Sequence, residues 1–406
     1  MSLKSIISLE YLITFLLIYT SRETLLFGTN NNNETLLVGY IVPILLLLLL
    51  FLLGGSSYLQ YAKPQKLCIT LSIFTAITML LNVDINIKYG YELLLFVLAL
   101  KYVKYITFKR FTEIYSNIMY YLSVFSAITA ILYMLYPSYV LLFPTIVNKG
   151  GLYFYNLFFA LIPAEMDGVY FRMYGIFREP GVAMIFINLA IIFELFIKKV
   201  KNYKKILVFI LAIGLTFSTA GYIVTFLILV SFLFASRKIN SSMAIVVLLL
   251  IIASTYIVYT NKFVYMLVFS KFSNSESSST AARFGSVVNN LNLLYNHPQG
   301  IIYGLGYQNV EDAFVNIGNR SLGEEHNTNT VLKELAVHGF FFTYILFSRI
   351  YKFFKNNFSL SKQNTILLFV VVLLMLGNED ISFNIILFIL AFYSFRPKCK
   401  LNTYEH

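Results

Sequence analysis

The chain has 406 residues, of which 58% are hydrophobic and 12% are charged, and its formal net charge is +12. Soluble domains carry about 25% charged residues, and a soluble fold could not keep this much apolar surface away from water. The composition therefore excludes a soluble globular protein and predicts an integral membrane protein.

Apolar runs recur along the whole chain at lengths of about 14 to 22 residues, which suit helices that cross a hydrocarbon core of about 30 Å. The alternating pattern of an outer-membrane barrel is absent. The predicted fold class is all-α: one polytopic membrane domain over residues 1–406 with about twelve transmembrane helices. The expected spans are Ile6–Tyr19, Leu36–Leu53, Leu67–Leu81, Tyr91–Phe108, Ile118–Leu135, Gly181–Ile197, Ile206–Phe217, Gly221–Ala235, Ala244–Tyr259, Asn327–Phe347, Ile366–Leu376 and Ile381–Phe395.

Three of these spans allow another interpretation. The first run is interrupted by Glu10 and lacks a small-residue cleavage site, so it is interpreted as a span rather than a signal peptide. The last two runs, joined by the turn GNED at 377–380, could instead form a re-entrant hairpin. Cys68 and Cys399 are interpreted as free thiols, because they fit no disulfide framework or metal motif.

Lysine and arginine gather on alternate connecting segments. Basic clusters lie at 101–110, 198–205 and 349–362, and the segments between them hold fewer such residues. By the positive-inside rule, this pattern predicts an even number of spans with both termini in the cytoplasm. The basic clusters can face anionic membrane lipids, so the net charge requires no nucleic-acid partner.

Two of the connecting segments expected outside are long, at 136–180 and 260–326. Long loops in compact proteins are usually functional or disordered, and both loops are expected to contain amphipathic helices and to cover an active site. The first carries the aromatic segment 151–164, which suits the headgroup layer. In the second, apolar residues follow Arg283 at helical spacing, which predicts an amphipathic helix that lies on the membrane or caps a cavity.

The stretch RMYGIFREPG precedes the sixth expected span. Pro180 suits the first turn of a helix, which places Glu179 at the N-cap. A helix N-terminus binds anions, and the guanidinium groups of Arg172 and Arg178 add bidentate donors that fit phosphate. Glu179 can orient an arginine or act on a sugar hydroxyl. The alternative is that both arginines anchor the helix in the headgroup layer and pair with acidic residues of the same loop.

A second motif begins at Arg283, a further candidate ligand for phosphate, whose alternative is a solvated helix end. It continues with HPQGIIYGLG at 297–306. The three glycines of this segment suggest a tight, closely packed turn. His297 is interpreted as a structural residue of that turn. No metal cage is apparent, and no cofactor is expected, because three arginines can neutralise a diphosphate.

A third motif, EEHNTNTVLKELAVHGF, opens the tenth expected span. His326 suits a proton acceptor, since histidine titrates near pH 6.5, and Glu325 or the preceding Glu324 can fix its tautomer. The alternative is a capping role at a helix start, where Thr328 or Asn329 are also candidates. Asn327 and Lys333 are secondary site candidates. Lys333 follows on nearly the same helical face, about 10 Å deeper, and can also be a packing or snorkelling residue.

The order of these motifs resembles that of the O-antigen ligase/polymerase superfamily. The motifs are R-x5-REPG, an outer-loop arginine, HP-x-G-x3-G-x-G and the HN motif. The Arg-Glu-Pro-Gly form and the chain size look most like bacterial surface-polysaccharide polymerases. The likeness covers roughly residues 172–339. A tryptophan that it implies after Arg283 is absent, because the chain contains none; Val287 or a neighbour stands there.

The resemblance implies a GT-C-like glycosyltransferase of the bacterial plasma membrane. Its donor and acceptor would be undecaprenyl-diphosphate-linked oligosaccharides on the outer face, and a chain-length regulator would be a protein partner. Arg172, Arg178 and Arg283 would bind the diphosphate, and His326 would take part in catalysis, with Glu179 as the other candidate base. The polymer would be a capsule or the O-antigen of lipopolysaccharide.

Two other functions stay open. A ligase of the same superfamily would move finished glycan to the lipid A core. A lipid-linked oligosaccharide flippase belongs to a different class and should carry polar residues midway through several spans. Few ionisable residues lie deep in the expected spans, and charges gather at the expected outer ends instead. This distribution favours chemistry at the surface over passage through the protein.

Overall fold

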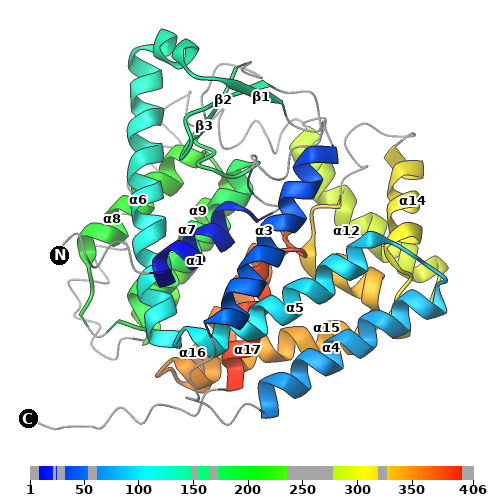
Figure 1. The fold of residues 1–406 in the computed structure, drawn as a ribbon. Helices are drawn as coiled ribbons and strands as arrows, with labels where there is room; N and C mark the ends of the chain where they lie inside the picture. The colour runs from blue at the N-terminus through cyan, green and yellow to red at the C-terminus, as the bar shows by residue number, and fades with distance from the viewer. Residues whose placement is uncertain are drawn as a thin grey trace, which may run out of the picture.

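The structure is a computed structural model that describes residues 9–21, 24, 33–53, 62–147, 153–164, 172–198, 200–235, 278–318 and 327–395, and this part of the chain is mostly helical (Figure 1). The ninth expected span, Ala244–Tyr259, lies outside these residues. The helices are α1 (Leu9–Tyr19), α3 (Asn33–Leu52), α4 (Ala62–Leu81), α5 (Ile87–Tyr105), α6 (Phe108–Leu135), α7 (Pro180–Phe196), α8 (Tyr203–Thr216), α9 (Thr219–Ala235), α12 (Ser278–Asn296), α13 (Gly300–Tyr303), α14 (Tyr307–Gly318), α15 (Thr330–Asn357), α16 (Lys362–Leu376) and α17 (Ile385–Phe392), with 3₁₀ turns at Pro137–Leu142 and Tyr393–Phe395.

Three of the described helices are long and apolar enough to cross a membrane, namely Lys63–Leu81 in α4, α6 and α15. Several others are equally apolar but shorter, such as α7 and α16. Large apolar side chains also point outward from the bundle, among them Leu48 and Leu52 of α3 and Leu80 of α4. Exposed apolar faces of this kind mark contact with lipid or protein. The helices therefore indicate a membrane protein, whereas a count of twelve spans stays a prediction.

The helices form two neighbouring groups. In one, α7 packs against α6, α8 and α9; in the other, α5 packs against α3, α4 and α17, and α15 against α4, α13, α16 and α17. Figure 1 shows the first group to the left of α3 and the second below and to the right. Every expected span in the described part overlaps one of these helices, because long apolar runs between polar breaks are the strongest helix signal in a membrane chain. The bounds differ most at the end of the chain, where α17 has only eight residues and α15 runs on to Asn357.

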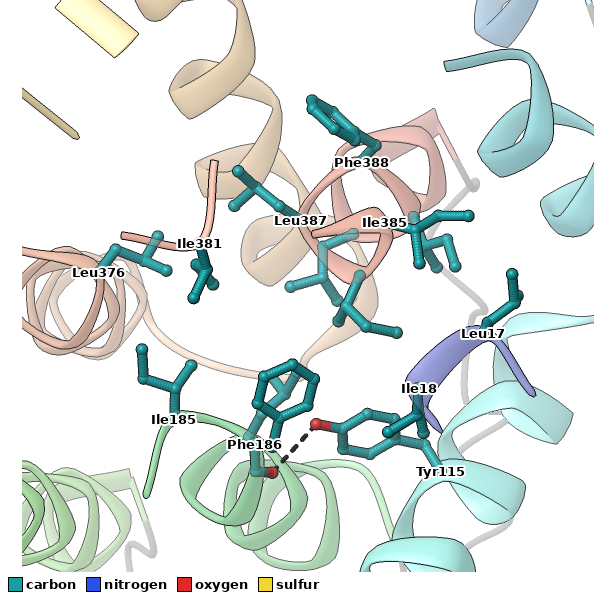
Figure 2. Close-up of a cluster of buried hydrophobic side chains, with 14 of the residues drawn as sticks. Leu17, Ile18, Tyr115, Ile185, Phe186, Leu376, Ile381, Ile385, Leu387 and Phe388 are labelled. Carbon is teal, nitrogen blue, oxygen red and sulfur yellow. Dashed lines mark hydrogen bonds between the residues drawn. The ribbon is translucent and has the colours of Figure 1, made fainter. Parts of the chain in front are cut away.

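Buried apolar side chains from both groups meet between them and line a small cavity (Figure 2). There Ile185 and Phe186 of α7 lie opposite Ile381 and Leu387 of the segment that follows α16. The hydroxyl of Tyr115 of α6 is buried among these side chains, where it donates a hydrogen bond of 3.0 Å to the main-chain oxygen of Phe186. This contact satisfies a polar group that would otherwise be costly to bury.

The first long loop contains a small antiparallel sheet, in the order β1 (Thr145–Val147), β2 (Tyr153–Asn156) and β3 (Leu161–Pro163). Ile146 pairs with Phe154, and Tyr155 pairs with Ile162. The expectation of an amphipathic helix in this loop is wrong for the residues that the structure describes between 136 and 180. Aromatic and β-branched residues favour strands, and buried Phe154 alternates with exposed Tyr153.

The second long loop contains the expected amphipathic helix, α12. Its polar face is turned inward, with Ser286 and Asn290 fully buried, and its apolar face outward, with Phe284 and Tyr295 exposed. The helix is therefore confirmed, and its position on a membrane surface stays a prediction.

The glycine-rich segment that follows α12 packs into a break in α15. The break lies at Gly339, whose φ is 80°, and there the N–H of Gly306 donates to the free oxygen of Val337 at 3.1 Å. A side chain at Gly304 would place its Cβ 2.1 Å from the same oxygen of Val337. Only glycine tolerates both the positive φ and this close approach. The expected tight turn is confirmed, and α15 begins as a separate short segment.

Candidate active site

The site begins at the N-terminus of α7. Glu179 is the N-cap residue and Pro180 is the first helical residue, as the sequence predicts. The Glu179 side chain makes no capping hydrogen bond within the described part of the chain. It lies instead 3.7 Å from Arg178, measured from Oε1 to Nη1, and is about half exposed. The positive end of α7 is thus free of its own acidic cap.

The turn between α16 and α17 lies directly against this helix end. Its Glu379 is buried and forms an ion pair of 2.8 Å from Oε1 to Nη2 of Arg283 on α12. The next residue, Asp380, accepts a hydrogen bond of 2.8 Å on its main-chain oxygen from Nη2 of Arg178. Two of the predicted arginines, more than a hundred positions apart in the chain, are therefore joined by two consecutive residues.

Gly181 makes this approach possible. A Cβ on Gly181 would lie 1.8 Å from Oε1 of Glu379 and 3.2 Å from Nη2 of Arg283. The ion pair thus packs against bare backbone in the first turn of α7, where a helix favours an anion. The glycine of the REPG motif therefore has a direct structural reason, which the sequence alone did not reveal.

The third predicted arginine, Arg172, lies at the other side of this cluster. Its Nε donates to the main-chain oxygen of Thr216, the last residue of α8, at 3.3 Å. A helix C-terminus favours a cation. Among the described residues, no carboxylate lies within ion-pair distance of Arg172. Its charge is nevertheless close enough to Arg283 and Glu379 for each to affect its pKa.

Lys333, a secondary candidate, also joins the cluster. Its ammonium group forms an ion pair with the carboxylate of Asp380 and lies 5.4 Å from the ring of Phe383. The hydroxyl of Thr330 donates to the main-chain oxygen of Glu379 at 2.6 Å and accepts from the N–H of Ile381 at 2.9 Å. The start of α15 therefore fixes the acidic turn on both sides.

Asn327, another secondary candidate, holds α12 against the start of α15. Its Nδ2 donates to Oδ1 of Asn290 at 3.0 Å, and Nδ2 of Asn290 returns a bond of 3.1 Å. Ser286 adds a third bond, of 2.9 Å, to Oδ1 of Asn327. Asn329 is the N-cap, with its side chain accepting from Leu332. Asn327 thus positions the helix that carries Arg283.

The cluster shifts the pKa of three groups. Burial lowers the pKa of Arg172 from its ordinary value. For Glu379, burial and the charge of Glu179 raise the pKa to about 8, against the opposing effect of Arg283 and Arg178. Burial alone would raise the pKa of Asp380, but the ion pair with Lys333 overcomes it and the net direction is downward. Glu379 is thus the acid of the cluster that titrates near neutral pH.

His326 and Glu325, predicted as catalytic and secondary residues, lie outside the described residues, as do Glu324 and two acids of the first loop, Glu165 and Asp167. The structure therefore brings together five of the predicted residues, namely Arg172, Arg178, Glu179, Arg283 and Lys333. It adds Glu379 and Asp380, which the prediction from sequence did not include. One sequence signal could have found them: two acids inside a short turn between long apolar runs need partners within the protein.

No known protein family, curated protein or solved structure matches this chain. The kind of protein is therefore inferred from its fold and from its cluster of arginines and carboxylates. Apolar helices suited to a membrane surround an arginine–carboxylate cluster at the N-terminus of a buried helix.

Proposed function

We propose that the chain is a polysaccharide polymerase, a glycosyltransferase that joins undecaprenyl-diphosphate-linked oligosaccharide repeat units on the outer face of the bacterial plasma membrane. The observation that carries the proposal is the gathering of Arg172, Arg178 and Arg283 around the first turn of α7. Permanently charged, bidentate donors beside a helix N-terminus fit a diphosphate.

The diphosphate would bind where Glu379 now lies. This carboxylate occupies the anion position at Gly181 and pairs with Arg283. An incoming diphosphate carries more negative charge and more acceptor oxygens than a carboxylate, so it would compete for Arg283. Arg172 would add a second guanidinium, and Arg178 would remain attached to the turn through Asp380. Below the raised pKa of Glu379, the site would thus exchange a neutral internal carboxyl for the substrate anion.

The reaction transfers the glycan from its diphosphate to a sugar hydroxyl of a second lipid-linked unit. The bond between the anomeric carbon and the phosphate oxygen breaks, and a bond from that carbon to the acceptor oxygen forms. The hydroxyl proton passes to His326 or, as the other candidate base, to Glu179. Polyprenyl diphosphate leaves with the electron pair. Arginines placed in advance stabilise the charge that develops on this leaving group, without a cofactor or a catalytic metal.

A deletion strain of the host tests the proposal by the length distribution of its surface glycans. A lost polymerase leaves a single repeat unit on the acceptor, a lost ligase leaves none, and a lost flippase leaves lipid-linked units inside the cell. We expect the single repeat, and we expect the wild-type gene to restore the ladder. A surface without any repeat would overturn the proposal in favour of the ligase or the flippase.

His326→Ala should fail to restore long chains although the protein reaches the membrane, because the proposed proton acceptor is gone. The matched control is His297→Ala, at the exposed end of α12, which should restore the ladder. Normal polymer from His326→Ala, at equal protein level, would remove this residue from the mechanism and leave Glu179 as the base.

A further inference from the structure

A second cluster of ionisable side chains lies fully inside the protein, apart from the arginines. It joins Glu92 of α5 to Glu334 and His338 of α15, and each of the three side chains is at most 2% exposed. One ligand atom from each, two carboxylate oxygens and an imidazole nitrogen, lies within 4.8 Å of the others. This site is not predictable from the sequence, because Glu92 lies on α5 and only the fold brings it to Glu334 and His338 on α15.

The spacing of these atoms fits a tetrahedral metal ion. Nε2 of His338 lies 3.2 Å from Oε1 of Glu92 and 3.7 Å from Oε2 of Glu334. Ligands at about 2.0–2.1 Å from a tetrahedral zinc ion are separated from each other by about 3.3 Å. The hydroxyl of Tyr307 borders the same space, 3.1 Å from Nε2 of His338 and 3.3 Å from Oε2, the other carboxylate oxygen of Glu92.

With both glutamates ionised, the charges of the cluster are unbalanced without a cation. Neither carboxylate oxygen of Glu334 has a hydrogen-bond partner among the described residues, although both are buried. The nearest lysine on the same helix, Lys333, is paired with Asp380. Even a protonated His338 would supply one positive charge for two carboxylates. A buried carboxylate is stable only when it is paired, protonated or bound to a metal.

We propose that Glu92, Glu334 and His338 bind one divalent transition-metal ion of the zinc class, beside the hydroxyl of Tyr307. Mixed imidazole and carboxylate ligands suit zinc, and two carboxylates neutralise its charge. All three ligands are buried away from solvent and substrate, so the site is structural rather than catalytic. This inference does not rest on the proposed function.

The position of the site explains what the ion does. It connects α5 to α15, and its ligand His338 directly precedes the break at Gly339. The broken helix lacks its own hydrogen bonds at this point, and cross-links to neighbouring helices replace them. Bound metal would therefore fix the short first segment of α15, which presents Thr330 and Lys333 to the arginine cluster.

Metal analysis of the full-length protein, purified in detergent without chelators from zinc-supplemented cells, tests the proposal. We expect about one zinc ion per chain in the wild type and its loss in Glu334→Gln and His338→Asn. The matched controls are Glu311→Gln, whose residue pairs with Lys88 at the surface, and His297→Asn, and both should keep the ion.

A measurement on the wild type avoids dependence on variants that fail to fold. X-ray absorption at the zinc edge should show nitrogen and oxygen ligands at about 2.0–2.1 Å and no sulfur. Removal of the ion by a chelator should lower the Tm, and zinc should restore it. Protein that contains no metal and takes up neither zinc nor cobalt overturns the proposal. So does zinc retained equally in Glu334→Gln and His338→Asn, or a site with sulfur ligands.

Discussion

Arg283 and Glu379 form an ion pair of 2.8 Å that packs against the bare α-carbon of Gly181. One partner comes from an amphipathic helix in a long loop, and the other from a short turn between two apolar helices. The pair holds a carboxylate at the helix end where an anion is most stable. If this carboxylate marks the place of a substrate diphosphate, several measurable properties follow.

The ion pair requires the absence of a side chain at residue 181. Gly181→Ala would place a Cβ 1.8 Å from Oε1 of Glu379, so the carboxylate must move and the ion pair must break. Overpacking of this kind costs about 1–3 kcal/mol. We expect a lower Tm in detergent and loss of polymer in cells. The matched control is Gly214→Ala in α8, where no atom lies within 4 Å of the added Cβ. This helical change should raise the stability by up to about 1 kcal/mol.

Replacing one guanidinium by an ammonium group should impair the enzyme although the charge stays. Lysine cannot supply the planar pair of donors that a phosphate accepts, so Arg172→Lys and Arg283→Lys should each lower the rate of polymer formation by about 10²-fold. Initial rates with purified protein provide the measurement. Arg349→Lys, at the far end of α15, is the control and should match the wild type. Equal rates in all three variants would argue against phosphate binding by these arginines.

Diphosphate binding should weaken as the pH rises through about 8, the raised pKa of Glu379. Below this pH the carboxyl is protonated and neutral, so Arg283 is available to the substrate. Above it, the ionised carboxylate competes for Arg283 and repels the diphosphate, and the affinity should fall by up to about tenfold per pH unit. The measurement is the Kd of a short polyprenyl diphosphate in nanodiscs. Glu379→Gln cannot ionise and should bind with little dependence on pH, and a slope that persists in this variant would assign the titration to another group.

The break in α15 should be sensitive to any side chain at Gly304. Alanine there would be strained at a φ of +82° and would meet the oxygen of Val337 at 2.1 Å. The two effects together should cost about 3–5 kcal/mol. At Gly175, where φ is +62° but the nearest atoms lie 3.6 Å away, alanine brings strain alone, about 1–2 kcal/mol. Thermal unfolding of both variants tests this order, and a Gly175→Ala protein less stable than Gly304→Ala would refute it.

The helices of this protein follow directly from its sequence. Apolar runs and their caps predicted α7 with Glu179 as N-cap and Pro180 at the first position, and Asn329 as one of two cap candidates for α15. Local signals of this kind depend on neighbouring residues only. The aromatic segment at 153–163 was not recognised as strands, because a sheet this short depends on pairing partners that no local pattern reveals.

The candidate site was predictable only in part. Arginines next to a Pro-Gly helix start have a recognisable chemistry, and the structure places Arg172, Arg178 and Arg283 around that start. Glu379 and Asp380 were overlooked, since their roles arise from contacts between distant segments. The contact of Glu92 with α15 was overlooked for the same reason, because the sequence around one glutamate in an apolar helix does not reveal which distant residues pack against it.

The most direct test is the purified protein in nanodiscs, supplied with a chemically defined polyprenyl-diphosphate-linked repeat unit and no other protein. The account predicts a ladder of products that are longer by whole repeat units, together with release of polyprenyl diphosphate. It also predicts that the variant with Arg172, Arg178 and Arg283 all changed to lysine forms no ladder while it keeps the fold. The absence of any product from the wild-type protein, or an undiminished ladder from the triple variant, would contradict the central claim that these arginines bind the diphosphate.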